Sequence, residues 1–166
     1  MGPLDSGNEA RGEPILENDP LTLDVAMPSL WSTAFVDDTV MKKNAALVVQ
    51  ICRPLCDFEF TYDERSVAWL EGYVERLRER GAFEQKFDTY AGVFGSYLGE
   101  PIIATYGGRW NEDGDPLHVL LDGNNKAFPF RKIRKQMIDG LEAGESILGF
   151  FQCIPALLAG ATRDES

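Results

Sequence analysis

The spacing of apolar residues predicts a helix in the region that follows residue 36. Asp37 or Asp38 is a suitable N-cap, because an aspartate can accept hydrogen bonds from the free N–H groups of a first helical turn. Apolar residues then recur at helical spacing to about Cys52, and Pro54 enforces a stop. The apolar face of this predicted helix consists of Val40, Leu47, Val48 and Ile51.

Two further helices are predicted, each closed by a glycine. Asp63 is the N-cap candidate of the second helix, and Gly81 suits the left-handed conformation that often follows a helix. The third helix carries an aromatic stripe that begins at Phe83, and we expect it to end at Gly99. Since the connection is short, the pair is predicted to form an antiparallel hairpin. The apolar positions of the two helices are Val67, Leu70, Tyr73, Val74 and Leu77, then Phe83, Phe87, Tyr90, Ala91, Phe94, Tyr97 and Leu98.

After Pro101 the apolar period changes to two, which is the period of a β-strand. Strands are predicted over residues 102–106, 117–121 and 126–130. The aspartate, glycine and two asparagines at residues 122–125 are turn formers between the last two strands. Three strands in sequence order predict an antiparallel meander.

The C-terminal part of the chain returns to a helical pattern. Residues 131–139 read as a short amphipathic helix that ends at Gly140. Glu145 or Ser146 begins a very apolar helix, which Pro155 is expected to bend or end. The order of helical hairpin, three-stranded antiparallel meander and C-terminal helices predicts an α+β fold.

Composition divides the chain into three parts. Residues 1–20 are rich in glycine, proline and acidic side chains, and we expect a flexible acidic arm there. Residues 21–160 are predicted to form a single α+β domain, and residues 161–166 a tail. Within the domain, residues 21–36 are irregular around Pro28 and fit a short strand or a segment that laces over the core.

The formal net charge is −11, from 16 basic and 27 acidic side chains. This balance disfavours unspecific binding to nucleic acid or to anionic membranes, because both are themselves negatively charged. It favours a basic protein as the partner.

The cysteines indicate a reducing compartment. Cys52, Cys56 and Cys153 form an odd set without paired zinc-ligand spacing, so neither a disulfide framework nor a bound metal is predicted, and no motif indicates a cofactor. The start of the sequence lacks the pattern of a signal peptide. The apolar run at 147–159 is interrupted by Gln152 and Pro155 and is shorter than the ~20 residues that span a bilayer. We therefore expect a soluble, cytoplasmic protein.

His118 is the single histidine, and no nucleophile is paired with it along the sequence. A structural role is the favoured interpretation. Catalytic carboxylate pairs meet in space, so the sequence leaves them open. A small hydrolase or transferase is therefore an alternative, with a cleft between meander and helices where carboxylates act with Tyr106, Arg109 or His118.

The loop at residues 111–115 reads Asn-Glu-Asp-Gly-Asp. Its oxygen ligands suggest calcium, but the register of a calcium-binding loop and its bidentate glutamate are missing. An acidic hairpin loop is the favoured interpretation, because asparagine, aspartate and glycine are turn formers.

A cluster of cations occurs at residues 131–135, where Arg131, Lys132, Arg134 and Lys135 surround Ile133. On a helix, Arg131, Arg134 and Lys135 share one side, while Ile133 and Met137 face the core. The cluster could hold a phosphate or an acidic arm of the same chain. A solvated helix face that offsets neighbouring acid is the favoured interpretation.

Gly107 and Gly108 precede Arg109 and Trp110. A glycine pair permits a sharp change of direction just before a large aromatic side chain. Trp110 is then either an interface anchor beside the acidic loop or a side chain that folds back on the helical hairpin.

Several short motifs together resemble a group of small bacterial domains of unknown function, over roughly residues 62–159. The motifs are Tyr97-Leu98-Gly99-Glu100, Tyr106-Gly107-Gly108-Arg109-Trp110, Phe128-Pro129-Phe130-Arg131-Lys132, and Gly144-Glu145-Ser146-Ile147 with Phe150-Phe151. Domains of this kind resemble immunity proteins encoded beside toxins of interbacterial secretion systems such as type VI. The resemblance implies a small acidic protein that binds its cognate toxin in the cytosol of the producer, and it supplies no catalytic residue.

We therefore expect a non-enzymatic binding protein that neutralises a toxin by direct contact. The expected partner-binding residues are Trp110, Glu112, Asp113, Asp115, Asp57 and Glu59. A third alternative is a homodimer or adaptor that associates through the apolar C-terminal helix. Its shared face would consist of Phe150, Phe151, Leu157 and Leu158.

Overall fold

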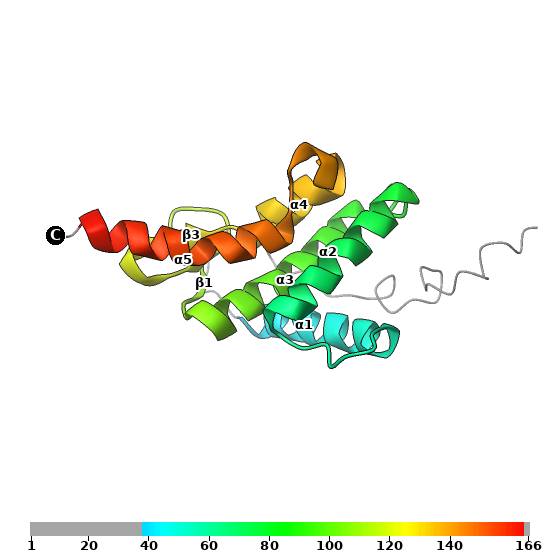
Figure 1. The fold of residues 1–166 in the computed structure, drawn as a ribbon, viewed down its shortest axis with the longest axis horizontal. Coiled ribbons are helices and arrows are strands. Elements are labelled where there is room, and N and C mark those ends of the chain that lie inside the picture. The colour runs from blue at the N-terminus through cyan, green and yellow to red at the C-terminus, as the bar shows by residue number, and fades with distance from the viewer. Residues whose placement is uncertain (1–37, 165–166) are drawn as a thin grey trace, which may run out of the picture.

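The computed structural model describes residues 38–164. The predicted acidic arm, the segment at 21–36 and the capping candidate Asp37 lie outside the described residues. The described chain is an α+β fold, with helices at both ends and a three-stranded antiparallel sheet in the middle (Figure 1). Its helices are α1 (Thr39–Cys52), α2 (Glu64–Glu79), α3 (Phe87–Tyr106), α4 (Pro129–Asp139) and α5 (Ile147–Asp164), and its strands are β1 (Arg109–Asn111), β2 (His118–Leu120) and β3 (Lys126–Ala127).

The first two helices have the predicted boundaries. α1 ends at Cys52, just before Pro54. Asp38 precedes its first turn but makes no side-chain capping bond, and pairs instead with Lys42 at 3.1 Å. α2 is capped as predicted, because the Asp63 carboxylate accepts a hydrogen bond from the Ser66 N–H at 2.9 Å.

The third helix corrects the prediction in two ways. α3 begins at Phe87 and runs through Gly99 and Pro101 to Tyr106, so the strand predicted over residues 102–106 is helix. The glycine that ends α3 is Gly107, which has a φ of +85° and whose N–H donates to the Ile103 carbonyl at 2.9 Å.

Gly99 has a packing role instead of a capping role. A Cβ atom at this position would lie 2.2 Å from the ring of Trp110. One turn earlier, a Cβ atom at Gly95 would lie 2.3 Å from the ring of Phe130. The two glycines therefore form a flat face on α3 that receives both aromatic rings.

The sheet confirms a three-stranded antiparallel meander, but its first strand lies at 109–111 and not at the predicted 102–106, and its second and third strands are shorter than predicted. β1 pairs with β2 and β2 with β3, both antiparallel, with Trp110 opposite Val119 and Val119 opposite Ala127. The first strand begins after the Gly107–Gly108 turn, where a Cβ at Gly108 would lie 2.6 Å from the Leu120 carbonyl oxygen. The third strand stops early because Pro129 occupies the first position of α4.

The C-terminal helices confirm one predicted boundary and correct another. α4 ends at Gly140, as predicted, with a φ of +80°. α5 begins just after Ser146 but continues through Pro155 to Asp164, so most of the predicted tail at 161–166 is helical.

The helices pack around α3, which forms its largest interfaces with α1 and α4, while α2 also packs on α5 (Figure 1). Buried apolar side chains from all five helices and from the sheet form one hydrophobic cluster. Its largest fully buried members are Tyr73, Tyr97, Phe60, Phe94, Phe151, Leu70, Leu77, Leu98, Ile102, Ile133 and Ile147.

Candidate functional site

A groove lies along α4, between this helix and the segment that enters β2. Its volume is about 340 Å³, near the lower end of the range for ligand pockets. We call it the α4 groove, and it is lined by Pro116, Leu117, Phe128, Phe130, Arg131, Arg134, Lys135, Ile138 and Asp139.

The floor of the α4 groove is apolar. Leu117 and Phe130 are buried, and Phe128 is half-buried. Ile138 stands at the edge with 63% of its surface exposed, and it is one of two large apolar side chains that are exposed among the described residues. This isoleucine extends the apolar lining of the groove to the protein surface.

The charged residues that line the groove are mostly cationic: Arg131, Arg134 and Lys135, with Asp139 as the one acidic member. Arg131 lies over the Phe128 ring, 4.5 Å from its centroid. Arg134 donates to Asp88 at 2.8 Å. Among residues 38–164, neither Arg131 nor Lys135 forms an ion pair with a carboxylate.

The sequence leaves two interpretations of the cationic cluster at residues 131–135: a site for a phosphate or an acidic arm, or a solvated helix face that offsets acid. Arg131, Arg134 and Lys135 share one side of α4, and Ile133 and Met137 are buried, as predicted. Lys132 points to Glu145 instead, with a nitrogen–oxygen distance of 2.5 Å. Lys132 and Arg134 thus offset neighbouring acid, while Arg131 and Lys135 form no ion pair among the described residues, and Arg134 lines the groove together with these two.

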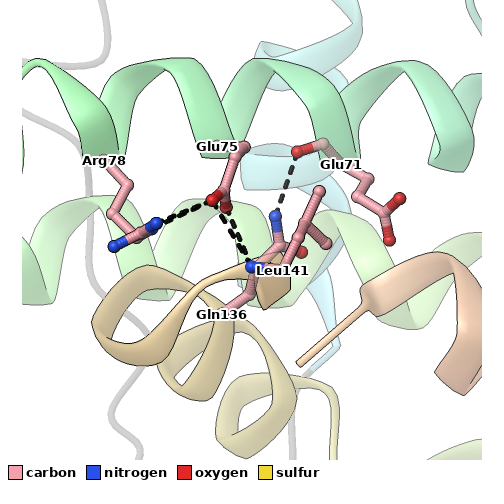
Figure 2. A network of polar contacts seen from close by, with 5 residues as sticks. All are labelled: Glu71, Glu75, Arg78, Gln136 and Leu141. Atoms are coloured by element: carbon pink, nitrogen blue, oxygen red, sulfur yellow. Dashed lines mark hydrogen bonds and ion pairs between the residues drawn. The ribbon is translucent and has the colours of Figure 1, made fainter. Parts of the chain in front are cut away.

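A buried glutamine fixes α4 to α2, as Figure 2 shows, and also to α5. The Gln136 side-chain nitrogen donates to the Glu71 carbonyl at 3.0 Å, and its oxygen accepts the Ile147 N–H at 3.3 Å. The Glu71 carboxylate accepts hydrogen bonds from the Ser146 hydroxyl and, at 3.0 Å, from the Leu148 N–H. The Gly144–Ile147 motif therefore joins three helices.

Glu75 makes a second link between α2 and the end of α4 (Figure 2). Its carboxylate accepts hydrogen bonds from Arg78 at 2.7 Å and from the Leu141 N–H at 3.3 Å. The hydrogen bond from Arg78 is the main reason why the pKa of Glu75 lies below its ordinary value. These bonds hold the helix that carries the groove in one orientation.

Trp110 lies in the core and is 5% exposed. Its ring packs on Gly99, and its indole N–H donates to the Glu100 carboxylate at 2.8 Å. Of the two interpretations of this residue, the structure supports the one in which the tryptophan folds back on the helices. Because its ring is already covered, the expectation of Trp110 as an interface anchor gains no support and stays a prediction.

The acidic residues expected to bind a partner lie in two separate places. In the 111–115 loop, Asp113 is exposed and Glu112 half-buried, while Asp115 pairs with Lys126, whose hydrogen bond lowers the pKa of Asp115. Among the other expected contacts, Asp57 is exposed, and Glu59 pairs with Arg53 at 3.2 Å. In Figure 1 the segment after α1 runs back along α1 to the start of α2, whereas the sheet lies beyond the C-terminal end of α3, so the two acidic segments do not form one patch.

The calcium interpretation of the 111–115 loop gains no support. Across the described part of the chain, no group of three or more histidine, cysteine or acidic side chains is arranged to hold a metal ion. None of the three cysteines in that part forms a disulfide: Cys52 is buried, Cys56 is half-buried and Cys153 is exposed. Burial is the main cause that raises the pKa of Cys56, and its thiol donates to the Cys52 carbonyl at 3.3 Å.

Two of the three residues of the predicted catalytic cleft, His118 and Tyr106, make contacts within the fold. His118 is buried, with Nδ1 2.8 Å from the Pro116 carbonyl oxygen and Nε2 3.4 Å from the Asn111 side-chain nitrogen. Since a carbonyl only accepts, Nδ1 is the protonated nitrogen. Tyr106 packs on Phe151, with ring centroids 5.1 Å apart, and Arg109 is exposed. None of the three expected residues lines the α4 groove.

α5 is the other apolar surface. The stretch Leu141–Gly160 is long and apolar enough to cross a membrane, with 17% of its most apolar window buried, but core helices of soluble proteins meet the same two criteria. The cytoplasmic location stays a prediction. Phe151 is buried, so it cannot belong to the expected shared face of a homodimer, whereas Leu157 is 43% exposed.

Sequence reasoning missed the α4 groove, although part of its signal was present. Arg131, Arg134, Lys135 and Ile138 recur at helical spacing, which places an isoleucine on a cationic face. Ile138 lies on the side of α4 away from the buried residues Ile133 and Met137. The contribution of Pro116 and Leu117 depends on how the meander packs, and no local pattern encodes it.

In comparisons with models of protein families, with curated proteins and with solved structures, nothing matched this chain at a significant level. A function therefore has to be argued from the geometry of the site and from the chemistry of its residues.

Proposed function

We propose that this chain is a protein-binding domain and that the α4 groove is its contact surface. The observation that carries the proposal is Ile138, which is 63% exposed beside an apolar floor and on the same side of α4 as three cations. An apolar centre with a charged rim is the usual composition of a protein interface. The groove fits a partner segment with an apolar side chain flanked by acidic residues.

The attachment of α4 supports the same proposal. A binding surface gains affinity when its elements are already in place before the partner arrives. Gln136 and Glu75 hold α4 against α2 and α5, and Phe130 packs on Gly95 from the floor of the groove. Binding can therefore proceed without first ordering this helix.

We further propose that the partner is a toxin that the chain neutralises in the cytosol by direct contact. The resemblance of the four motifs to immunity-related domains supports this part, and so does the net charge of −11, which would steer a basic protein toward the chain. Asp57, Asp113 and Glu112 would contribute to steering, because they make no ion pair among the described residues.

The test is a pull-down from the native bacterium with the tagged full chain in three forms. The wild type is compared with Ile138→Ser and with Leu157→Ser, a matched loss of an exposed apolar side chain on α5. We expect one stoichiometric partner to bind the wild type and Leu157→Ser, and to be lost from Ile138→Ser. A partner that binds all three forms equally, or no partner for the wild type, would contradict the proposal.

The captured partner allows a separate test of neutralisation. The partner is produced in a host cell alone, with the wild-type chain, or with Ile138→Ser. A toxin should stop growth when produced alone, and the wild type should restore growth more fully than the variant. A partner that is harmless by itself would contradict the toxin proposal and leave the binding proposal intact.

A further inference from the structure

The α4 groove specifies the chemistry of its occupant. Arg131 and Lys135 are exposed and form no ion pair with any described carboxylate. Both line the same groove as the buried apolar residues Leu117 and Phe130 and the exposed Ile138. A complementary peptide therefore offers apolar side chains at its centre and carboxylates on either side.

One segment of the chain outside the described residues has this chemistry. Residues 13–19 read Glu-Pro-Ile-Leu-Glu-Asn-Asp. Ile15 and Leu16 are adjacent, Glu13 precedes them, Glu17 and Asp19 follow, and no basic residue interrupts the segment. Residues 21–36 are apolar too, but Asp24 is their single acidic residue, so they match the floor of the groove and not its rim.

The distribution of charge favours the same pairing. Residues 1–37 hold seven acidic side chains and one basic side chain, a formal charge of −6. Residues 38–164 hold 19 acidic and 15 basic side chains, a formal charge of −4. More than half of the net charge of the chain thus precedes Asp38, while α4 carries a cationic cluster.

The connection is long enough to reach. Eighteen residues separate Asp19 from Asp38, and an extended chain of that length spans about 60 Å. A compact domain of the described size has a radius of gyration of about 14 Å and a diameter of about 36 Å. Segment 13–19 can therefore reach a surface on any side of the domain.

We propose that residues 13–19 of the same chain occupy the α4 groove, with Ile15 and Leu16 on the apolar floor and the three carboxylates toward Arg131, Arg134 and Lys135. The inference rests on the proposed function of the groove and adds its regulation. A partner must displace this internal segment, so its apparent affinity is reduced by the fraction of molecules in which the groove is covered.

The test is zero-length carbodiimide cross-linking of the full chain, which joins a lysine to a carboxylate in direct contact. Equal amounts of natural-isotope and ¹⁵N-labelled protein are mixed, so that linked peptides of one isotope mark contacts within a molecule. The Lys132–Glu145 pair, at 2.5 Å, serves as the internal control for reaction and folding. We expect Lys135 to be linked to Glu13, Glu17 or Asp19 within one molecule.

Variants decide whether the apolar pair directs this contact. Replacing Ile15 and Leu16 together by serine should lower the Lys135 cross-link at least about tenfold, because two apolar side chains lose their burial. The matched control replaces Leu21 and Leu23 by serine and should leave the cross-link unchanged. An unaltered yield in the first variant would overturn the proposal, as would linked pairs that contain both isotopes, which identify a second copy as the occupant.

Two results separate this inference from the proposed function. A partner that requires Ile138, in a protein whose Lys135 forms no cross-link to residues 13–19, would support the binding function and overturn the internal segment. A cross-link within one molecule, together with no partner for the wild type or for the Ile15→Ser/Leu16→Ser double variant, would support the internal segment and overturn the binding function. If both proposals hold, the double variant should capture more partner than the wild type.

Discussion

Replacement of Gly99 by alanine tests how α3 carries the sheet. The new Cβ would lie 2.2 Å from two carbons of the Trp110 ring, where an ordinary contact is 3.4 Å or more. The ring is buried and held by its hydrogen bond to Glu100, so relief requires a shift of more than 1 Å of a rigid group. Overpacking of this kind costs up to about 3 kcal/mol.

The same substitution also stabilises the helix, because alanine has the higher helix propensity. Alanine is favoured over glycine by about 1 kcal/mol inside a helix. We therefore expect Gly99→Ala to lower the free energy of unfolding by about 2 kcal/mol net, which corresponds to a fall in Tm of about 8 °C for a domain of this size.

Gly72→Ala in α2 is the matched control, because the nearest atom to its new Cβ is the flexible end of Arg76, at 3.3 Å. That variant gains helix propensity without a rigid clash and should raise the Tm. Both are measured by thermal and urea unfolding of the full chain, followed by circular dichroism. A Gly99→Ala protein as stable as the wild type would refute the packing argument, and so would equal changes in the two variants.

Three further outcomes follow from the contacts. The pKa of the Glu75 carboxyl is lowered in the folded state. Its contribution to stability is therefore complete above its ordinary pKa of 4.5 and is lost as the pH falls through the folded value. In urea unfolding between about pH 5 and pH 3, the wild type should lose stability more steeply than Glu75→Gln. Gln136→Leu leaves the Glu71 carbonyl and the Ile147 N–H without their partner. It should lower the free energy of unfolding, measured with urea, by about 2 kcal/mol or more. Unchanged stability would mean that other groups replace these two hydrogen bonds. If α5 mediates self-association, light scattering after gel filtration should give twice the monomer mass, and Leu157→Ser should restore the monomer; a wild-type monomer at all concentrations would exclude it.

The sequence predicted the elements that have local signals. Asp63 and Ser66 form the expected cap of α2, and Gly140 ends α4 as its pattern indicated. The order of the meander was also predictable, because turn residues separate the second and third strands. These features depend on side chains close together in the sequence.

The errors arose where tertiary contacts outweigh local preference. Residues 102–106 contain two isoleucines and a threonine, which favour a strand, yet Ile102 is buried as part of α3. Gly99 resembles a helix end in sequence, and only the Trp110 ring across from it explains why a glycine is needed in mid-helix. The α4 groove was missed for a related reason, since residues from the meander form one of its sides.

Phe130 connects the buried packing of the protein to its proposed contact surface. Its ring lies against Gly95 of α3 and 5.6 Å from the Trp110 ring, and it also lines the α4 groove. Because the ring is shared, a change at Gly95 would disturb the core and the groove together. Ile138 and Lys135 lie on the outer side of the same helix and contribute little to the core. Substitutions at Ile138 and Lys135 should therefore alter binding while leaving stability nearly unchanged, which is the separation that a test of the groove requires.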